Sequence, residues 1–240
     1  MGLFAELDTK NVERTEDSVG NGFSVLDSNV YDAKIKTAYA GSSKGGALRV
    51  TLVCDINGRE YSEDIYITSR DKKPYFVTKQ NKKRFLPGYL IMDSVCKLTI
   101  GKGISDPELE SEEKVLNVYD PVEGKKKPTA VPVLVELAGK TICLGILKEL
   151  HNKTRQDETG AFVETSESRE RNNINVVFHA DTHKTLNEME DDKDAVFYDK
   201  WLERNKFKVI DRRKVKNTDD SAPFGVDVPE KKTRSKLFAD

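Results

Sequence analysis

Cationic and aromatic side chains alternate through one stretch of the chain, from Lys34 to Phe85. Cationic groups neutralise phosphates and flat rings stack on unpaired bases, so this interleaving is typical of surfaces that bind single-stranded nucleic acid. For each residue taken singly, a plain core or solvated-face role stays open. Taken together, the set predicts DNA binding by Lys34, Lys36, Arg49, Tyr66, Arg70, Lys72, Lys73, Tyr75, Phe76, Lys82, Lys83, Arg84 and Phe85.

Acidic side chains could instead hold Mg²⁺ for a nuclease, which needs carboxylates from several rigid strands aimed at one point. Most carboxylates here lie in runs, such as Asp106–Glu113 and Glu188–Asp194, and runs on loops point in many directions. Asp55, Glu63 and Asp64 fall on expected strands, where a solvated face explains them equally well. A Mg²⁺-dependent nuclease is therefore the alternative, and the preferred interpretation has no catalytic residue and no cofactor.

Histidine and cysteine residues give no metal-site pattern. His179 and His183 are four residues apart, a spacing that could put two ligands on one helical face, but no Cys or third His lies nearby. Cys54, Cys96 and Cys143 are odd in number and stand among apolar neighbours. We expect buried free thiols, with no disulfide and no zinc.

Charge is unevenly distributed along the 240 residues, although the net charge is only −1. Residues 29–103 hold 14 Lys and Arg against 7 Asp and Glu, a net charge of +7, so the remainder carries −8. A basic segment balanced by acidic ones is typical of a soluble protein with a face for a polyanion. Chance grouping in a charge-rich chain is the other interpretation.

Strands are the elements expected to position the candidate residues. Residues 30–40, 47–56 and 59–68 alternate between apolar and polar side chains, which predicts three antiparallel strands in a meander. Asn57-Gly58 is a strong hairpin signal, because both turn positions need positive φ. The pattern directs Tyr66 outward, and the glycine-rich residues 41–46 form a flexible turn.

A second, basic hairpin is expected after this meander, with strands at Tyr75–Val77 and Arg84–Leu86 and a tip at Lys79–Lys83. Apolar residues at helical spacing then predict a helix that stops at Gly101. Further strands are expected at residues 113–120, 130–139 and 140–150, with Gly139-Lys140 as a hairpin turn. Residues 152–192 look polar except for a short strand at 174–180, and an amphipathic helix follows at 194–206.

This order predicts a mainly β protein: an OB-fold Greek-key barrel with one helix between strands 3 and 4, an inserted basic hairpin and a short C-terminal helix. We expect a polar leader at residues 1–28, the barrel with a C-terminal extension at 29–206, and a disordered charged tail at 207–240. No apolar run approaches the length of a membrane span, and the acidic N-terminal residues are unlike a signal peptide.

The stretches VYDAKIKTAYAGSSKGGALRVTL, NGREYSEDIYIT, FLPGY, LTIGKG, VPVLVEL and LGILKEL together resemble the single-stranded DNA-binding proteins of tailed bacteriophages. The resemblance covers roughly Ser24 to Lys206. It implies an OB-fold that coats and protects single-stranded DNA in phage replication and recombination. It also implies phage replication proteins as partners and the cytoplasm of the infected bacterial host as location.

The tail departs from that family, many of whose members end in an acidic tail with a terminal aromatic residue. Residues 211–240 here hold 8 Lys and Arg against 6 Asp and Glu. Only Phe238 and Asp240 resemble the acidic and aromatic end of that family. Roles of an acidic tail are therefore not carried over to this chain. An OB-fold module that binds proteins and no DNA stays as a third interpretation.

Overall fold

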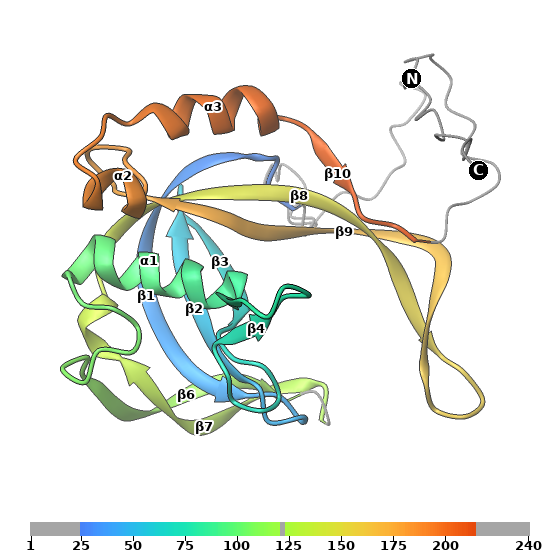
Figure 1. Ribbon diagram of the computed structural model, residues 1–240. Coiled ribbons are helices and arrows are strands. Elements are labelled where there is room, and N and C mark those ends of the chain that lie inside the picture. The colour runs from blue at the N-terminus through green and yellow to red at the C-terminus, as the bar shows by residue number, and fades with distance from the viewer. Residues whose placement is uncertain (1–24, 121–122, 215–240) are drawn as a thin grey trace, which may run out of the picture.

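The computed structural model describes residues 25–120 and 123–214, and the first 24 residues of the expected leader lie outside them. The fold is mainly β, an antiparallel sheet with three α-helices (Figure 1). The expected meander is confirmed as β1 (Asn29–Ser42), β2 (Leu48–Ile56) and β3 (Arg59–Tyr66). Asn57 and Gly58 have φ values of 53° and 78°, as the turn between β2 and β3 requires.

The basic hairpin and the first helix also lie where the sequence predicts them. β4 (Tyr75–Val77) and β5 (Lys83–Phe85) pair only with each other and form a separate two-stranded sheet. α1 (Pro87–Ile100) follows and ends at Gly101, whose φ of 74° lets its N–H reach the carbonyl of Lys97. The helix buries Met92, Val95, Cys96 and Leu98 against the main sheet.

β6 (Ser111–Asp120) and β7 (Lys125–Leu134) form the next hairpin, and a short 3₁₀ turn at Val135–Leu137 leads to β8 (Thr141–Gln156). The expected hairpin turn at Gly139-Lys140 is wrong, because β7 and β8 do not pair with each other. Both instead pair with β1. The long strand β1 therefore pairs with β2 along one side and with both β7 and β8 along the other.

The predicted closed barrel is not found among the described strands. The pairing runs β9-β8-β1-β2-β3, where β9 is Phe162–Phe178, and β3 and β9 share no ladder of backbone hydrogen bonds. A side chain intervenes between them: the backbone N–H of Ile174 on β9 donates to the Glu63 carboxylate on β3 at 2.9 Å. The two edges therefore face each other across a seam.

β8 and β9 continue past the main sheet as a long two-stranded arm (Figure 1). The sequence predicts only a short strand at 174–180 in this polar region, and the structure instead has the long strand β9 paired with β8. Both faces of the outer arm are in water, so its strands are mostly polar, leave even Phe162 exposed and show no apolar alternation. Backbone pairing holds these strands together, and side-chain contacts such as the 2.9 Å ion pair of Lys153 with Glu167 add to it.

The C-terminal part contains α2 (Leu186–Glu190), α3 (Val196–Asn205) and β10 (Val209–Asp211). α3 confirms the expected amphipathic helix and buries Trp201. The expected tail at 207–240 begins too early, because β10 pairs in parallel with β8 and Arg212 bonds Glu149. The tail from 215 onward lies outside the described residues.

Cys54, Cys96 and Cys143 are buried, as expected. Burial raises the pKa of each thiol to about 12, which disfavours the nucleophilic thiolate form. Among the described residues, no helix has both the length and the apolar character that crossing a bilayer requires.

Candidate nucleic-acid interface

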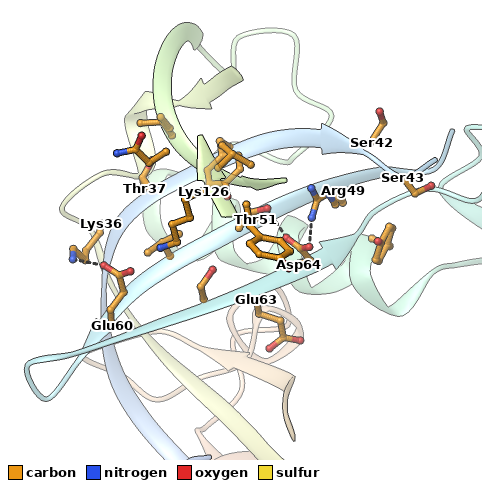
Figure 2. Close-up of a pocket in the computed structure, with 18 of the residues that line it drawn as sticks. Lys36, Thr37, Ser42, Ser43, Arg49, Thr51, Glu60, Glu63, Asp64 and Lys126 are labelled. Atoms are coloured by element: carbon orange, nitrogen blue, oxygen red, sulfur yellow. Dashed lines mark hydrogen bonds and ion pairs between the residues drawn. The ribbon is translucent and has the colours of Figure 1, made fainter. Parts of the chain in front are cut away.

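A groove of about 910 Å³ lies on the outer face of β1, β2 and β3, where the β6–β7 hairpin forms its other side (Figure 2). The alternation of side chains along β2 explains the lining of the groove. Val50 and Leu52 point into the core. Arg49, Thr51 and Val53 point into the groove. Its polar and aromatic lining residues are Lys36, Thr37, Tyr39, Ser42, Ser43, Lys44, Arg49, Thr51, Glu60, Ser62, Glu63, Asp64, Tyr66, Asn117, Tyr119 and Lys126.

Three tyrosines come to this groove from three different strands. Tyr39 lies on β1, Tyr66 at the end of β3 and Tyr119 on β6. Tyr66 is 47% exposed and Tyr119 is 57% exposed, so both rings offer accessible faces to a ligand. Exposed rings along a groove are the feature on which unpaired bases stack.

The cations predicted on this face are already paired with carboxylates. Lys36 Nζ lies 2.6 Å from the Glu60 carboxylate, and Arg49 forms an ion pair with Asp64 (Figure 2). The hydrogen bond to Lys36 lowers the pKa of Glu60, and the same bond raises the pKa of Lys36. Two of the four cations that line the groove are therefore neutralised internally, which leaves Lys44 and Lys126.

More free positive charge lies on the β4–β5 hairpin and the loop that leads to it than in the groove. Residues 69–86 contain seven Lys and Arg against one acid, Asp71. Within the described part of the chain, none of these seven cations forms an ion pair. Lys83 instead lies over the Tyr75 ring, 4.8 Å from its centroid.

The hairpin begins at the end of the groove that holds Tyr66 and Arg49. The backbone N–H of Leu48 donates to Thr68 Oγ1 at 2.9 Å, which fixes the start of the hairpin segment to β2. The Arg70 side chain lies beneath the β1–β2 turn, where a Cβ on Gly45 would come within 3.2 Å of Arg70 Nε. The turn and the start of the basic segment therefore lie close together here.

The structure therefore divides the predicted residues into two neighbouring groups. Lys36, Arg49 and Tyr66 line the groove, whereas Lys34 is exposed on β1 outside the groove lining. The other predicted residues lie on the basic segment and the hairpin and do not line the groove. Among them, Phe76 and Phe85 are about half exposed. These others are Arg70, Lys72, Lys73, Tyr75, Phe76, Lys82, Lys83, Arg84 and Phe85.

Sequence reasoning missed Tyr39, Lys44, Tyr119 and Lys126, which also line the groove. The run Lys125–Lys127 pairs with the end of β6, so Tyr119 lies directly opposite Lys126. An aromatic residue close to a lysine run was therefore available as a signal. What the sequence did not show is that this hairpin folds back over the face of β1–β3.

Acidic residues in this region do not converge on a point. Glu63 and Asp64 are successive strand residues, so they point to opposite sides of β3 (Figure 2). Among described residues, no group of three or more His, Cys, Asp or Glu is placed to hold a metal ion. His183 lies in a turn and stacks on Tyr198 at 4.3 Å between ring centroids, and His179 Nδ1 lies 3.2 Å from the Thr182 hydroxyl.

Comparisons of the chain with protein-family models, with curated proteins and with solved structures find no match. The groove and the basic hairpin therefore carry the functional argument by themselves.

Proposed function

We propose that this chain binds single-stranded DNA without sequence preference and performs no chemistry on it. The observation that carries the proposal is the groove with three tyrosines, at whose end an unpaired cluster of seven cations begins. Stacking needs exposed rings and phosphate neutralisation needs free cations. Here the two features lie side by side on one molecule.

The order of the strands supports an OB-type fold. β1 is antiparallel to both β2 and β8, and these in turn are antiparallel to β3 and β9, so β3 and β9 run in the same direction. If β3 met β9, the five strands would form a Greek-key barrel with α1 between its third and fourth members. The β4–β5 and β6–β7 hairpins are then insertions on either side of the helix.

Bases and phosphates have separate places in this proposal. Bases lie in the groove against Tyr66 and its neighbours, where two of the four lining cations are paired with carboxylates. Phosphates run along the β4–β5 hairpin, whose cations have no internal ion-pair partners among the described residues. A role in coating transient single strands during phage replication and recombination follows if the sequence resemblance holds.

Fluorescence-anisotropy titration tests the proposal. The protein is titrated into a labelled thymidine oligonucleotide and into a duplex of equal length, each at low and at higher salt. Binding is expected to favour the single strand and to weaken with salt by about 0.7 log units per log unit of salt for each phosphate neutralised. Equal binding to duplex, or no binding at low salt, contradicts the proposal.

A protein-interaction module is a second candidate, because the structure has an apolar cleft remote in sequence from the groove. This cleft measures about 330 Å³, and Leu90, Ile91, Leu186 and Phe197 are among its lining residues. Leu90 and Phe197 are nearly half exposed. An absence of DNA binding even at low salt would favour this function.

A further inference from the structure

We infer that Asp64 is a specificity-determining residue, which holds Arg49 in an internal ion pair so that the groove admits base-stacking single strands and rejects other polyanions. The inference rests on the proposed function and concerns the same groove. It explains why a DNA-binding face would contain carboxylates at all.

Asp64 is held in place on the groove floor by two contacts. Its Oδ2 accepts from Arg49, and its Oδ1 accepts from the Thr51 hydroxyl at 2.5 Å. Thr51 is directly opposite Asp64 in the β2–β3 register and is only 5% exposed, so it cannot turn away without disturbing the sheet. The carboxylate therefore occupies the place on Arg49 that a phosphate oxygen would take.

The ion pair leaves Arg49 incompletely satisfied. Its Nε is buried and has no hydrogen-bond partner among the described residues, whereas Nη1 bonds Asp64. A guanidinium can donate in two parallel bonds to a phosphate, and such bidentate pairs are stronger than single contacts. Because Nε is buried, a phosphate or sulfate could reach Arg49 only through its Nη atoms, one of which already bonds Asp64.

Selectivity follows from the position of Tyr66 relative to this pair. Tyr66 is the direct cross-strand partner of Arg49, so an exposed ring lies beside the ion pair. A single strand can stack a base on this ring while Asp64 keeps its bond to Arg49. Duplex DNA has its bases stacked internally, and a sulfated polysaccharide has none, so either could bind here only with a phosphate or sulfate that displaces Asp64.

The Lys36–Glu60 ion pair opposes the binding of a polyanion less than the Arg49–Asp64 pair does. The Lys36 and Glu60 side chains are 48% and 52% exposed, whereas those of Arg49 and Asp64 are 21% and 42% exposed. Exposed pairs contribute little because solvent and salt screen them. Most of the discrimination is therefore assigned to Asp64.

The test compares wild type with Asp64→Asn, which removes the charge and keeps one oxygen that can accept from Thr51 in place of the carboxylate. Anisotropy titrations use a thymidine oligonucleotide, a duplex of equal length and heparin as a polyanion without bases. Affinity for duplex and heparin is expected to rise about fivefold, and affinity for the single strand by less than about twofold. The single-strand preference falls accordingly.

Glu167→Gln is the matched control, since Glu167 pairs with Lys153 at 2.9 Å on the outer arm and its removal changes the net charge equally. The control should leave the single-strand preference unchanged. If Asp64→Asn raises all affinities equally, as the control does, the inference is overturned and the proposed function stands. If wild type binds no DNA, the proposed function itself fails.

Thr51→Val provides a second variant in case Asp64→Asn does not fold. It removes the hydrogen bond that fixes Asp64 and leaves all charges in place. We expect a smaller decrease of single-strand preference in the same direction. An unchanged preference in a folded Thr51→Val protein also contradicts the inference.

Discussion

Tyr66 presents a 47% exposed ring at the junction of the groove and the basic hairpin. Tyr66→Ala is expected to weaken single-strand binding by about 1–3 kcal/mol, the free energy of one stacked base. The slope of affinity against salt should stay the same, because the tyrosine ring neutralises no phosphate. Titrations at several salt concentrations measure both quantities.

Phe162→Ala is the control for this change, because Phe162 is 73% exposed on the outer arm and far in sequence from the groove. It should leave the affinity unchanged, and Tyr66→Phe should bind nearly as wild type does. Equally weakened binding in Tyr66→Ala and Phe162→Ala would show that Tyr66 holds no base.

Glu63 lies in the seam between β3 and β9, half-buried among polar partners. Burial raises the pKa of its carboxyl, although hydrogen bonds from the Tyr61 hydroxyl and the Ile174 N–H act in the opposite direction. Since the folded pKa lies above the unfolded pKa, the contribution of Glu63 to stability is present at acidic pH. It disappears as the pH rises through the interval between the two values.

Glu63→Gln should therefore flatten this part of the stability profile, because glutamine stays neutral and can still accept both hydrogen bonds. The unfolding temperature, measured across acidic to neutral pH, should fall less with rising pH in the variant than in wild type. Glu60→Gln should act with the opposite sign, since Lys36 lowers the pKa of Glu60 and the contribution of Glu60 disappears as the pH falls. Parallel profiles for Glu63→Gln and wild type would contradict the assignment.

The sequence predicts which way a side chain points only where the apolar–polar alternation within a single strand determines it. Tyr66 and Arg49 point outward as the alternation of β2 and β3 requires. Glu63 resembles any residue of a solvated face in the sequence, because nothing local shows that β9 covers that side of β3. The ion pair between Arg49 and Asp64 likewise depends on the register of two strands.

The β4–β5 hairpin carries the free cations, so it should govern the salt dependence of binding. Replacing Lys82, Lys83 and Arg84 by Ala should lower the slope of log affinity against log salt by about 0.7 for each phosphate that is no longer neutralised. The matched control replaces Lys153, Arg155 and Arg169 on the outer arm, with the same change in charge. Equal slopes for the two triple variants would contradict a phosphate-binding role.

The outer arm should contribute little to the stability of the sheet. Replacing residues 154–164 by Asn-Gly removes strand ends that are exposed and pair mainly with each other, together with the ion pair of Glu164 to Lys214. Calorimetry should show an unfolding temperature within a few degrees of wild type, since an exposed ion pair is worth at most about 1 kcal/mol. A large drop would mean that the arm supports the core.

Elements with a clear period are predictable from the sequence, and those without one are not. The meander, the basic hairpin, α1 and α3 follow from apolar spacing and turn residues. The outer arm has no apolar face, so its sequence resembles that of a loop. β10 gives no strand signal, because it is three residues beside a run of charges and only pairing with β8 orders it.

At the scale of the whole molecule, the uneven charge of the sequence becomes a spatial division. The basic residues 69–86 lie together around the β4–β5 hairpin, whereas Glu188–Asp194 lies at α2 and the turn to α3 (Figure 1). A net charge of −1 is thus compatible with a strongly basic region. The sequence predicts the two charge blocks but not that the seam between β3 and β9 stays unpaired.

Photo-crosslinking tests most directly where bases lie. Single-stranded DNA that carries 5-iodouracil is bound to the protein, irradiated and digested, and the modified peptides are identified by mass spectrometry. We expect adducts at Tyr66, with Tyr39 or Tyr119 as further sites, and their disappearance in Tyr66→Ala at that position only. Adducts confined to the outer arm or to the cleft at Phe197 would contradict binding of bases in the groove.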